Sequence, residues 1–240
     1  MSTSTWGPGR DAPSANSAAT AAADARLAQL QNALKLQEAE RKAGKTAFLC
    51  NRSKRGGGEL TDEEAYRVKV IDELINTELD YINSLKLTQR LFVEPLQKER
   101  GLLEKKNIPV LFANLQDLIS LNQKLADQLT NQGGNVVEEQ CVGKAFIAVA
   151  ERGEMEKVYP DYCANHQNAT TTLRELQRDN KHVKFAKWLE KQQLLAELRM
   201  RPLSSFLIAP VQRVCKYPLL LRELLKRTPK THSDYRDLQK

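Results

Sequence analysis

The sequence predicts an all-α protein, an elongated helical bundle that follows a disordered N-terminal region. Apolar residues recur at three- and four-residue steps in several long segments after residue 60, which is the spacing of one helix face. No segment alternates apolar and polar positions with the Val, Ile and Thr enrichment of strands. The chain up to about residue 24 is rich in Ala, Ser and Thr without aliphatic periodicity, which is typical of disorder.

Residues 1–60 are therefore predicted to form a disordered or partly helical extension, and residues 61–240 the folded domain. Residues 24–43 contain good helix formers, but their leucine stripe is short, so a lone, partly formed helix is favoured over a coiled coil. Three consecutive glycines at 56–58 predict a flexible linker. No Gly-Lys-Ser/Thr follows them, so a phosphate-binding loop is not indicated.

The folded domain is predicted to begin at Thr61, because Thr61 and Glu64 have the spacing of a capping box. Pro95 is expected to bend or end the first helix, and Pro160 to separate two later helices. The expected helices cover about residues 63–91, 110–130, 136–150, 161–178, 183–200 and 209–225, with a last one beginning near residue 232.

Charge is distributed unevenly along the chain. The formal net charge is +7, and residues 181–240 contain 14 Lys and Arg against 5 Asp and Glu. A basic final quarter favours an acidic partner, an anionic membrane surface or nucleic acid. Four scattered cysteines predict free thiols in a reducing compartment, and no apolar run approaches the length of a membrane span. We expect a cytoplasmic protein, with recruitment to a membrane as an option.

Glu78 interrupts the apolar stripe of the first long helix, which steps through positions 68, 71, 75, 82 and 85. Burying a lone carboxylate costs several kcal/mol, so Glu78 must reach the surface, meet a cation or await a partner molecule. From the spacing alone, a residue at the edge of the bundle or an internal salt bridge is favoured over a binding role.

The segment 209–225 has two faces with different composition. Its prolines, Pro210 and Pro218, each remove a backbone donor and predict a bent helix. The face expected in the core carries Leu203, Leu207, Val211, Val214, Pro218, Leu221 and Leu225. The second face carries Gln212, Lys216, Leu219 and Glu223.

Three segments together resemble the conserved regions of Dbl-homology domains, the exchange factors for Rho-family GTPases. They are VIDELINTELDYINSL, VYPDYCANHQNATTTLRELQ and LSSFLIAPVQRVCKYPLLLRELLKRTPKTHSDY. They follow one another in the family's order within residues 65–240, and the third is highly specific. The resemblance implies an all-α domain that promotes GDP release by non-covalent displacement, without a cofactor or a metal. It also implies a C-terminal truncation, because Lys240 falls within the first turns of the family's last helix.

The resemblance also implies a binding surface. In the family, the first and third regions pack side by side, and their outer edges bind the GTPase. By position, Glu78 would contact switch I, while Lys216, with Gln212 beside it, would contact switch II. Leu219 lies on the same face as Lys216 and is included in the predicted surface.

Two further positions bear on which GTPase is preferred. Ile208 falls where the family discriminates Rac from Cdc42, and isoleucine there leans towards Rac. Arg222 is expected to meet an acidic edge of a Rho-type protein. The implied partner is therefore a Rho-family small GTPase of the Rac, Rho or Cdc42 type, and nucleic acid is not an expected partner.

Other classes of function are less well supported by the residues. A conventional enzyme is disfavoured because His166, His182 and His232 lie far apart without a nucleophile motif. Cys163 and His166 could supply half a zinc site, but no second pair of ligands is evident. A basic nucleic-acid-binding protein lacks a recognisable motif. A non-catalytic helical scaffold remains as an alternative.

Overall fold

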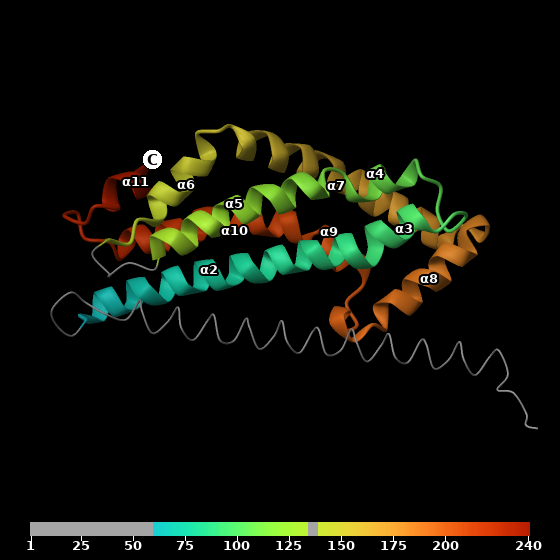
Figure 1. The fold of residues 1–240 in the computed structure, drawn as a ribbon, viewed down its shortest axis with the longest axis horizontal. Helices are drawn as coiled ribbons and strands as arrows, with labels where there is room; N and C mark the ends of the chain where they lie inside the picture. The colour runs from blue at the N-terminus through green and yellow to red at the C-terminus, as the bar shows by residue number, and fades with distance from the viewer. Residues whose placement is uncertain (1–59, 134–138) are drawn as a thin grey trace, which may run out of the picture. The chain divides into compact units, whose positions relative to one another are not determined.

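In the computed structural model of the protein, the described residues are 60–133 and 139–240, and all regular structure among them is helical (Figure 1). This confirms the predicted fold class. The predictions for residues 1–59, including the helix at 24–43, lie outside the described residues. The helices are α2 (Asp62–Thr88), α3 (Glu94–Lys98), α4 (Asn107–Phe112), α5 (Leu115–Gly133), α6 (Val142–Ala150), α7 (Glu154–Arg178), α8 (Val183–Gln193), α9 (Leu203–Leu207), α10 (Ala209–Lys226) and α11 (Tyr235–Gln239).

Helix α2 begins with the predicted capping box. The Thr61 hydroxyl accepts a hydrogen bond from the Glu64 amide at 3.3 Å, and the Glu64 carboxylate accepts one from the Thr61 amide at 2.8 Å. Three acidic residues in the first turn favour the same start, because they face the positive end of the helix dipole.

The prolines interrupt the helices less than the sequence predicts. Pro95 does not end the first helical run, because a π-helical turn at Gln89–Val93 joins α2 directly to α3. Pro160 lies inside α7, which begins at Glu154 rather than at residue 161. It stands in the second turn, where the loss of one amide leaves the rest of the helix intact. Pro210 lies in the first turn of α10, where a proline is well tolerated, and α9 precedes it as a separate short helix.

Two predicted helices are shorter than expected because the backbone turns. Ala113 has φ of 45° and separates α4 from α5, which were expected as one helix. The helix predicted to reach residue 200 ends at Gln193, because Leu195 is extended with ψ of 132°, and Arg199 and Met200 follow with positive φ. The helix predicted at 136–150 is described from Val142 onward.

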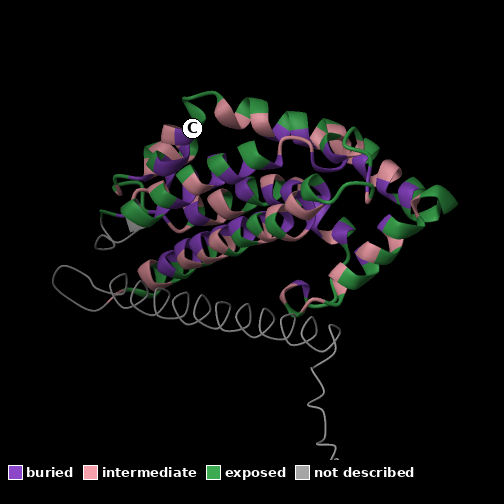
Figure 2. Cartoon of the chain, turned by 45° about the vertical axis from the view of Figure 1, so that its right-hand side comes forward, coloured by how far each residue is buried: buried purple, intermediate pink, exposed green. Residues whose placement is uncertain are grey.

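The core lies between α2, α5, α7 and α10, whose buried residues form stripes on the facing sides of the helices (Figure 2). On α10 this stripe differs from the predicted one. Its buried residues are Pro210, Arg213, Tyr217 and Leu224, while Pro218 is exposed and Val214 is half-buried. The helix is rotated because Arg213 and Tyr217 have polar partners inside the bundle. None of the described helices is long and apolar enough to cross a membrane.

Candidate functional site

Helices α2 and α10 lie side by side and run in opposite directions. Glu63 Oε2 of α2 is 3.3 Å from Arg227 Nη1 beyond the end of α10, and Thr77 Oγ1 is 2.8 Å from Arg213 Nη1. Between these two contacts α2 advances by fourteen residues and α10 recedes by fourteen. This constant register tells which residues of the two helices stand at the same level.

Glu78 lies inside the bundle, fully buried. Its Oε2 accepts hydrogen bonds from Arg213 Nε at 2.8 Å and from the Tyr217 hydroxyl at 2.9 Å, and it lies 2.7 Å from Arg213 Nη2. Burial raises the pKa of Glu78, and the charge of Arg213 and these hydrogen bonds oppose that shift. Glu78 thus forms the internal salt bridge that the spacing favoured, through Oε2, while Oε1 is buried without a hydrogen-bond partner. A carboxylate buried in this way is not exposed for the direct contact with a partner protein that the resemblance implies.

The same polar cluster reaches two more helices. The Tyr217 hydroxyl lies 3.0 Å from Asn122 Oδ1 on α5, and the Tyr159 hydroxyl of α7 donates to the same oxygen at 2.8 Å. The rings of Tyr159 and Tyr217 meet edge to face, with centroids 6.3 Å apart. Arg213 and Tyr217 thereby fix the rotation and the height of α10 against its neighbours.

The residues that precede these two anchors point the other way. Gln212 and Lys216 stand one turn apart on α10 and are exposed, as the sequence predicts. Leu219 continues this line of residues and is 61% exposed, so it adds an apolar group to the exposed face. Neither Gln212 nor Lys216 makes a side-chain hydrogen bond or ion pair with a described residue.

An exposed carboxylate that the sequence analysis missed stands beside them. Glu73 lies one turn before Thr77, on the side of α2 that borders α10, and the register of the two helices places it at the level of Tyr217. Its side chain has no hydrogen bond or ion pair among the described residues. We define the outer border as Glu73, Gln212, Lys216 and Leu219. It offers an acid, an amide, an amine and an apolar group along one seam.

The other two predicted site residues lie off this seam. Ile208 is half-buried at the junction of α9 and α10, one turn before Gln212. The backbone amide of Gln212 donates to the Ile208 carbonyl at 3.1 Å. Arg222 is exposed, but it stands about 60° around α10 from Leu219, on the side turned away from α2.

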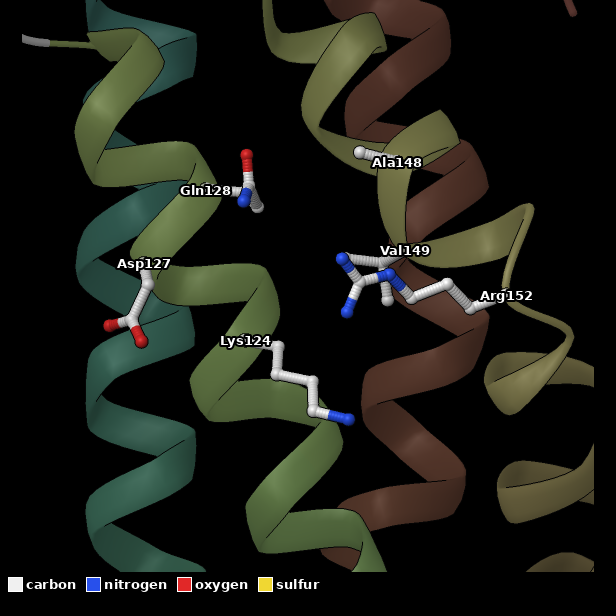
Figure 3. Close-up of a pocket in the computed structure, with 6 residues that line it drawn as sticks. All are labelled: Lys124, Asp127, Gln128, Ala148, Val149 and Arg152. Carbon is white, nitrogen blue, oxygen red and sulfur yellow. The ribbon is translucent and has the colours of Figure 1, made fainter.

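One hollow of about 360 Å³ is lined only by uncharged residues of the π-helical turn, α3, α4 and the start of α5: Gln89, Val93, Gln97, Ile108, Pro109, Phe112, Ala113, Leu115 and Gln116. Another, of about 150 Å³, lies between α5 and α6, lined by Lys124, Asp127, Gln128, Ala148, Val149 and Arg152 (Figure 3). It is smaller than ordinary ligand sites, and Lys124 pairs with Glu154 at 2.7 Å. Within residues 60–133 and 139–240, no three His, Cys, Asp or Glu side chains are placed to hold a metal, and Cys163 is a free thiol.

Comparison with known proteins gives sequence relatives over most of the chain. Residues 70–240 match the RhoGEF domain family. The chain is 38% identical over 179 residues to the myosin-M heavy chain of Dictyostelium discoideum, covering 74% of this chain and 10% of that protein. It is 32% identical over 181 residues to Rho guanine nucleotide exchange factor 9 of Homo sapiens, covering 75% of this chain and 34% of that protein. The chain thus spans less than two thirds of the length of either relative.

Solved structures share the helical fold. A DH/PH fragment of PDZ-RhoGEF in complex with human RhoA gives a TM-score of 0.67 at 24% identity, covering 75% of this chain and 51% of that chain. The Vav1 exchange factor gives a TM-score of 0.64 at 26% identity, covering 74% and 46%. The match over residues 70–240 and the shared helical fold show that this chain belongs to the RhoGEF, or Dbl-homology, domain family.

Proposed function

We propose that this chain is a guanine nucleotide exchange factor for a Rho-family small GTPase, and that the outer border of α2 and α10 is its docking surface. The observation that carries the proposal is the set of exposed, internally unpaired groups Glu73, Gln212 and Lys216 along one seam. Membership of the RhoGEF family supports it, as does the complex of the PDZ-RhoGEF fragment with RhoA.

The proposed mechanism is differential binding. A surface that fits the nucleotide-free GTPase better than the loaded form lowers the free energy of the state from which GDP has left. A thousandfold faster release requires about 4 kcal/mol of such preference. Glu73 would hold the first switch away from the nucleotide, and Lys216 would hold the second switch over the magnesium site. The chain itself makes and breaks no bond in the nucleotide.

In this proposal Glu78 is a positioning residue. It binds Arg213 and Tyr217, and these residues directly follow Gln212 and Lys216 in the sequence. Because adjacent helix residues point about 100° apart, anchoring one pair inward directs the other pair outward. The buried acid would therefore act on the GTPase only through α10.

Nucleotide release tests the docking surface. We expect Glu73→Ala and Lys216→Ala each to slow release of a fluorescent GDP analogue at least about a hundredfold, since each removes a charged contact that is desolvated in the complex. Both side chains are exposed, so thermal unfolding should stay within about 0.5 kcal/mol of wild type. Asp117→Ala on α5 and Lys157→Ala on α7 are matched controls that should exchange normally. Wild-type release by both border variants would place the docking surface elsewhere.

The choice of GTPase is a finer part of the proposal. A panel of Rac, Rho and Cdc42 proteins should show the fastest release from Rac, because Ile208, one turn before Gln212, matches the family's Rac-favouring residue. The RhoA complex of the PDZ-RhoGEF fragment makes Rho the main competitor. Faster release from RhoA or Cdc42 than from Rac would contradict this preference without affecting the docking surface.

A further inference from the structure

Helix α8 packs through one face only. Phe185 and Leu189 are buried, and the ring of Trp188 stacks with Phe185 and meets Phe92 of the π-helical turn edge to face at 6.2 Å between centroids. These contacts fix α8 to the end of the bundle opposite α11 (Figure 1). Its other face is turned to solvent.

The solvent face of α8 is basic and partly apolar. Lys184, Lys187 and Lys191 follow at steps of three and four and are all exposed. None of their side chains makes a hydrogen bond or ion pair with a described residue. Val183 and Leu194 lie on the same face, 43% and 68% exposed. A single acid, Glu190, stands at its edge. Single exposed apolar residues are common on protein surfaces, but here they stand on the same face as three lysines.

The loop after α8 extends this surface. The Gln193 side-chain amide donates to the Met200 carbonyl at 2.9 Å, which holds Met200 close to the end of α8 where Leu194 lies. Met200 is 59% exposed. The acid of this loop, Glu197, is paired with Arg90 at 2.9 Å. Leu194 and Met200 are therefore two exposed apolar residues near the C-terminal end of α8, beyond the last lysine.

We propose that this surface, Lys184, Lys187 and Lys191 with Leu194 and Met200, binds the surface of an acidic phospholipid membrane. Lysines beside exposed apolar side chains match an interface in which the amines meet lipid phosphates and the apolar groups enter the boundary of the acyl chains. Phosphates of a nucleic acid would use the same lysines, but they offer nothing to Leu194 and Met200. The combination of lysines with exposed apolar side chains therefore favours a lipid surface over a nucleic acid.

The lipid surface lies apart from the outer border. Glu73 and Phe92 are separated by nineteen residues of continuous helical chain, or roughly 28 Å along its axis. A protein bound at the outer border and a membrane bound at α8 would therefore contact different parts of the domain. The proposal does not depend on the exchange function.

Vesicle sedimentation of the full chain tests the proposal. The protein should sediment with phosphatidylcholine vesicles that contain about a third phosphatidylserine and remain free with pure phosphatidylcholine. The variant Lys184→Glu, Lys187→Glu, Lys191→Glu should bind the acidic vesicles at least about a hundredfold more weakly, since each lysine contributes about fivefold. The control variant Lys144→Glu, Lys157→Glu, Lys230→Glu has the same net charge but alters exposed lysines elsewhere. It should keep most of the binding.

A second variant separates lipid from nucleic acid. Leu194→Ser with Met200→Ser should weaken vesicle binding about tenfold while leaving any binding to duplex DNA unchanged. Equal vesicle binding by wild type and the α8 lysine variant would overturn the proposal. So would equal loss in the two lysine variants, or DNA binding that depends on the α8 lysines without vesicle binding. Circular dichroism melting should show that all variants fold, because the substituted side chains are exposed.

Discussion

Arg213 and Glu78 are buried side chains of opposite charge. Burying either charge without the other would cost several kcal/mol. Arg213 makes two further hydrogen bonds that offset desolvation: Nη1 donates to Thr77 Oγ1 at 2.8 Å and Nη2 donates to the Leu74 carbonyl at 3.2 Å. Its guanidinium also lies over the Tyr217 ring, 4.9 Å from the centroid. A buried pair of this kind adds little net stability over an apolar pair. It does, however, make one rotation of α10 much more favourable than the others.

Removing one partner of this pair should cost far more than removing both. We expect Arg213→Ala to lower the free energy of unfolding by about 3–5 kcal/mol, because Glu78 is left as a buried charge without its cation. The double variant Glu78→Leu with Arg213→Met should recover most of that loss. Urea unfolding measures both. A single-variant loss below about 1 kcal/mol would show that the pair does not fix α10 in place.

The sequence predicted which face of α10 is exposed, while the acid of α2 that the resemblance implies is buried. Gln212 and Lys216 were identified correctly as exposed, because they lie on a face of α10 that the apolar residues avoid. The interrupted apolar stripe favoured an edge residue or an internal salt bridge for Glu78, and the structure shows the salt bridge with Arg213. Only the resemblance assigned Glu78 a contact with a partner. The acid that can meet a partner must lie off the stripe, as Glu73 does five residues earlier. The contacts of Arg213 with Thr77 and with the Leu74 carbonyl identify which side of α2 borders α10.

At the scale of elements, α6 and α11 pack closely against each other at Gly143. Asp234 accepts hydrogen bonds from the first amides of α6, Val142 at 3.0 Å and Gly143 at 2.8 Å, and pairs with the buried Arg67 of α2 at 3.2 Å. Burial raises the pKa of Asp234, and the charge of Arg67 opposes that shift. This carboxylate caps α6 and connects it to the start of α2, so the segment before α11 closes one end of the bundle.

Gly143 is where the close approach can be tested. A Cβ at this position would lie 2.7 Å from the Asp237 carbonyl carbon and the Leu238 amide nitrogen, so the backbone of α11 would have to move. We expect Gly143→Ala to lower the free energy of unfolding by about 1–3 kcal/mol through this overlap, despite the better helix propensity of alanine. Hydrogen exchange should rise first in residues 235–239.

Lys144→Ala is the matched control, because it changes the adjacent exposed residue of α6 without an added contact. It should stay within about 0.5 kcal/mol of wild type in the same urea titration. A neutral Gly143→Ala would mean that α11 does not pack against α6 in solution. The sequence could not predict this contact, because a single glycine in a helical pattern does not tell what approaches it.

Helix boundaries were predictable where local chemistry decides them. The capping box was predictable from the four residues Thr61 to Glu64, because both partners lie within one turn. The breaks at Ala113 and Leu195 could not be found in this way, because neither residue is a turn former such as Gly or Pro. Pro160 misled for the complementary reason: it costs one hydrogen bond, which a long packed helix can lose.

The whole domain presents two surfaces on different elements, the outer border of α2 and α10 and the lysine face of α8. The helical run from α2 through the π-helical turn connects them. Glu73 lies in this run, and so does Phe92, whose ring packs edge to face against Trp188 of α8. If both proposals hold, a membrane bound at α8 would hold the outer border near GTPases that share that membrane. Confinement of this kind raises the effective concentration of the partner without any new contact.

Exchange assays on vesicles test this coupling. In solution, the Lys184→Glu, Lys187→Glu, Lys191→Glu variant should release nucleotide from a Rho-family GTPase at the wild-type rate, because α8 lies roughly 28 Å along the helical run from Glu73. On acidic vesicles that carry a tethered GTPase, the wild-type chain should work at least about tenfold faster than in solution. The α8 lysine variant should show no such gain, and the Lys144, Lys157 and Lys230 control should keep it. Slower exchange by the α8 variant in solution would mean that α8 supports the outer border directly, and the two surfaces would then be one.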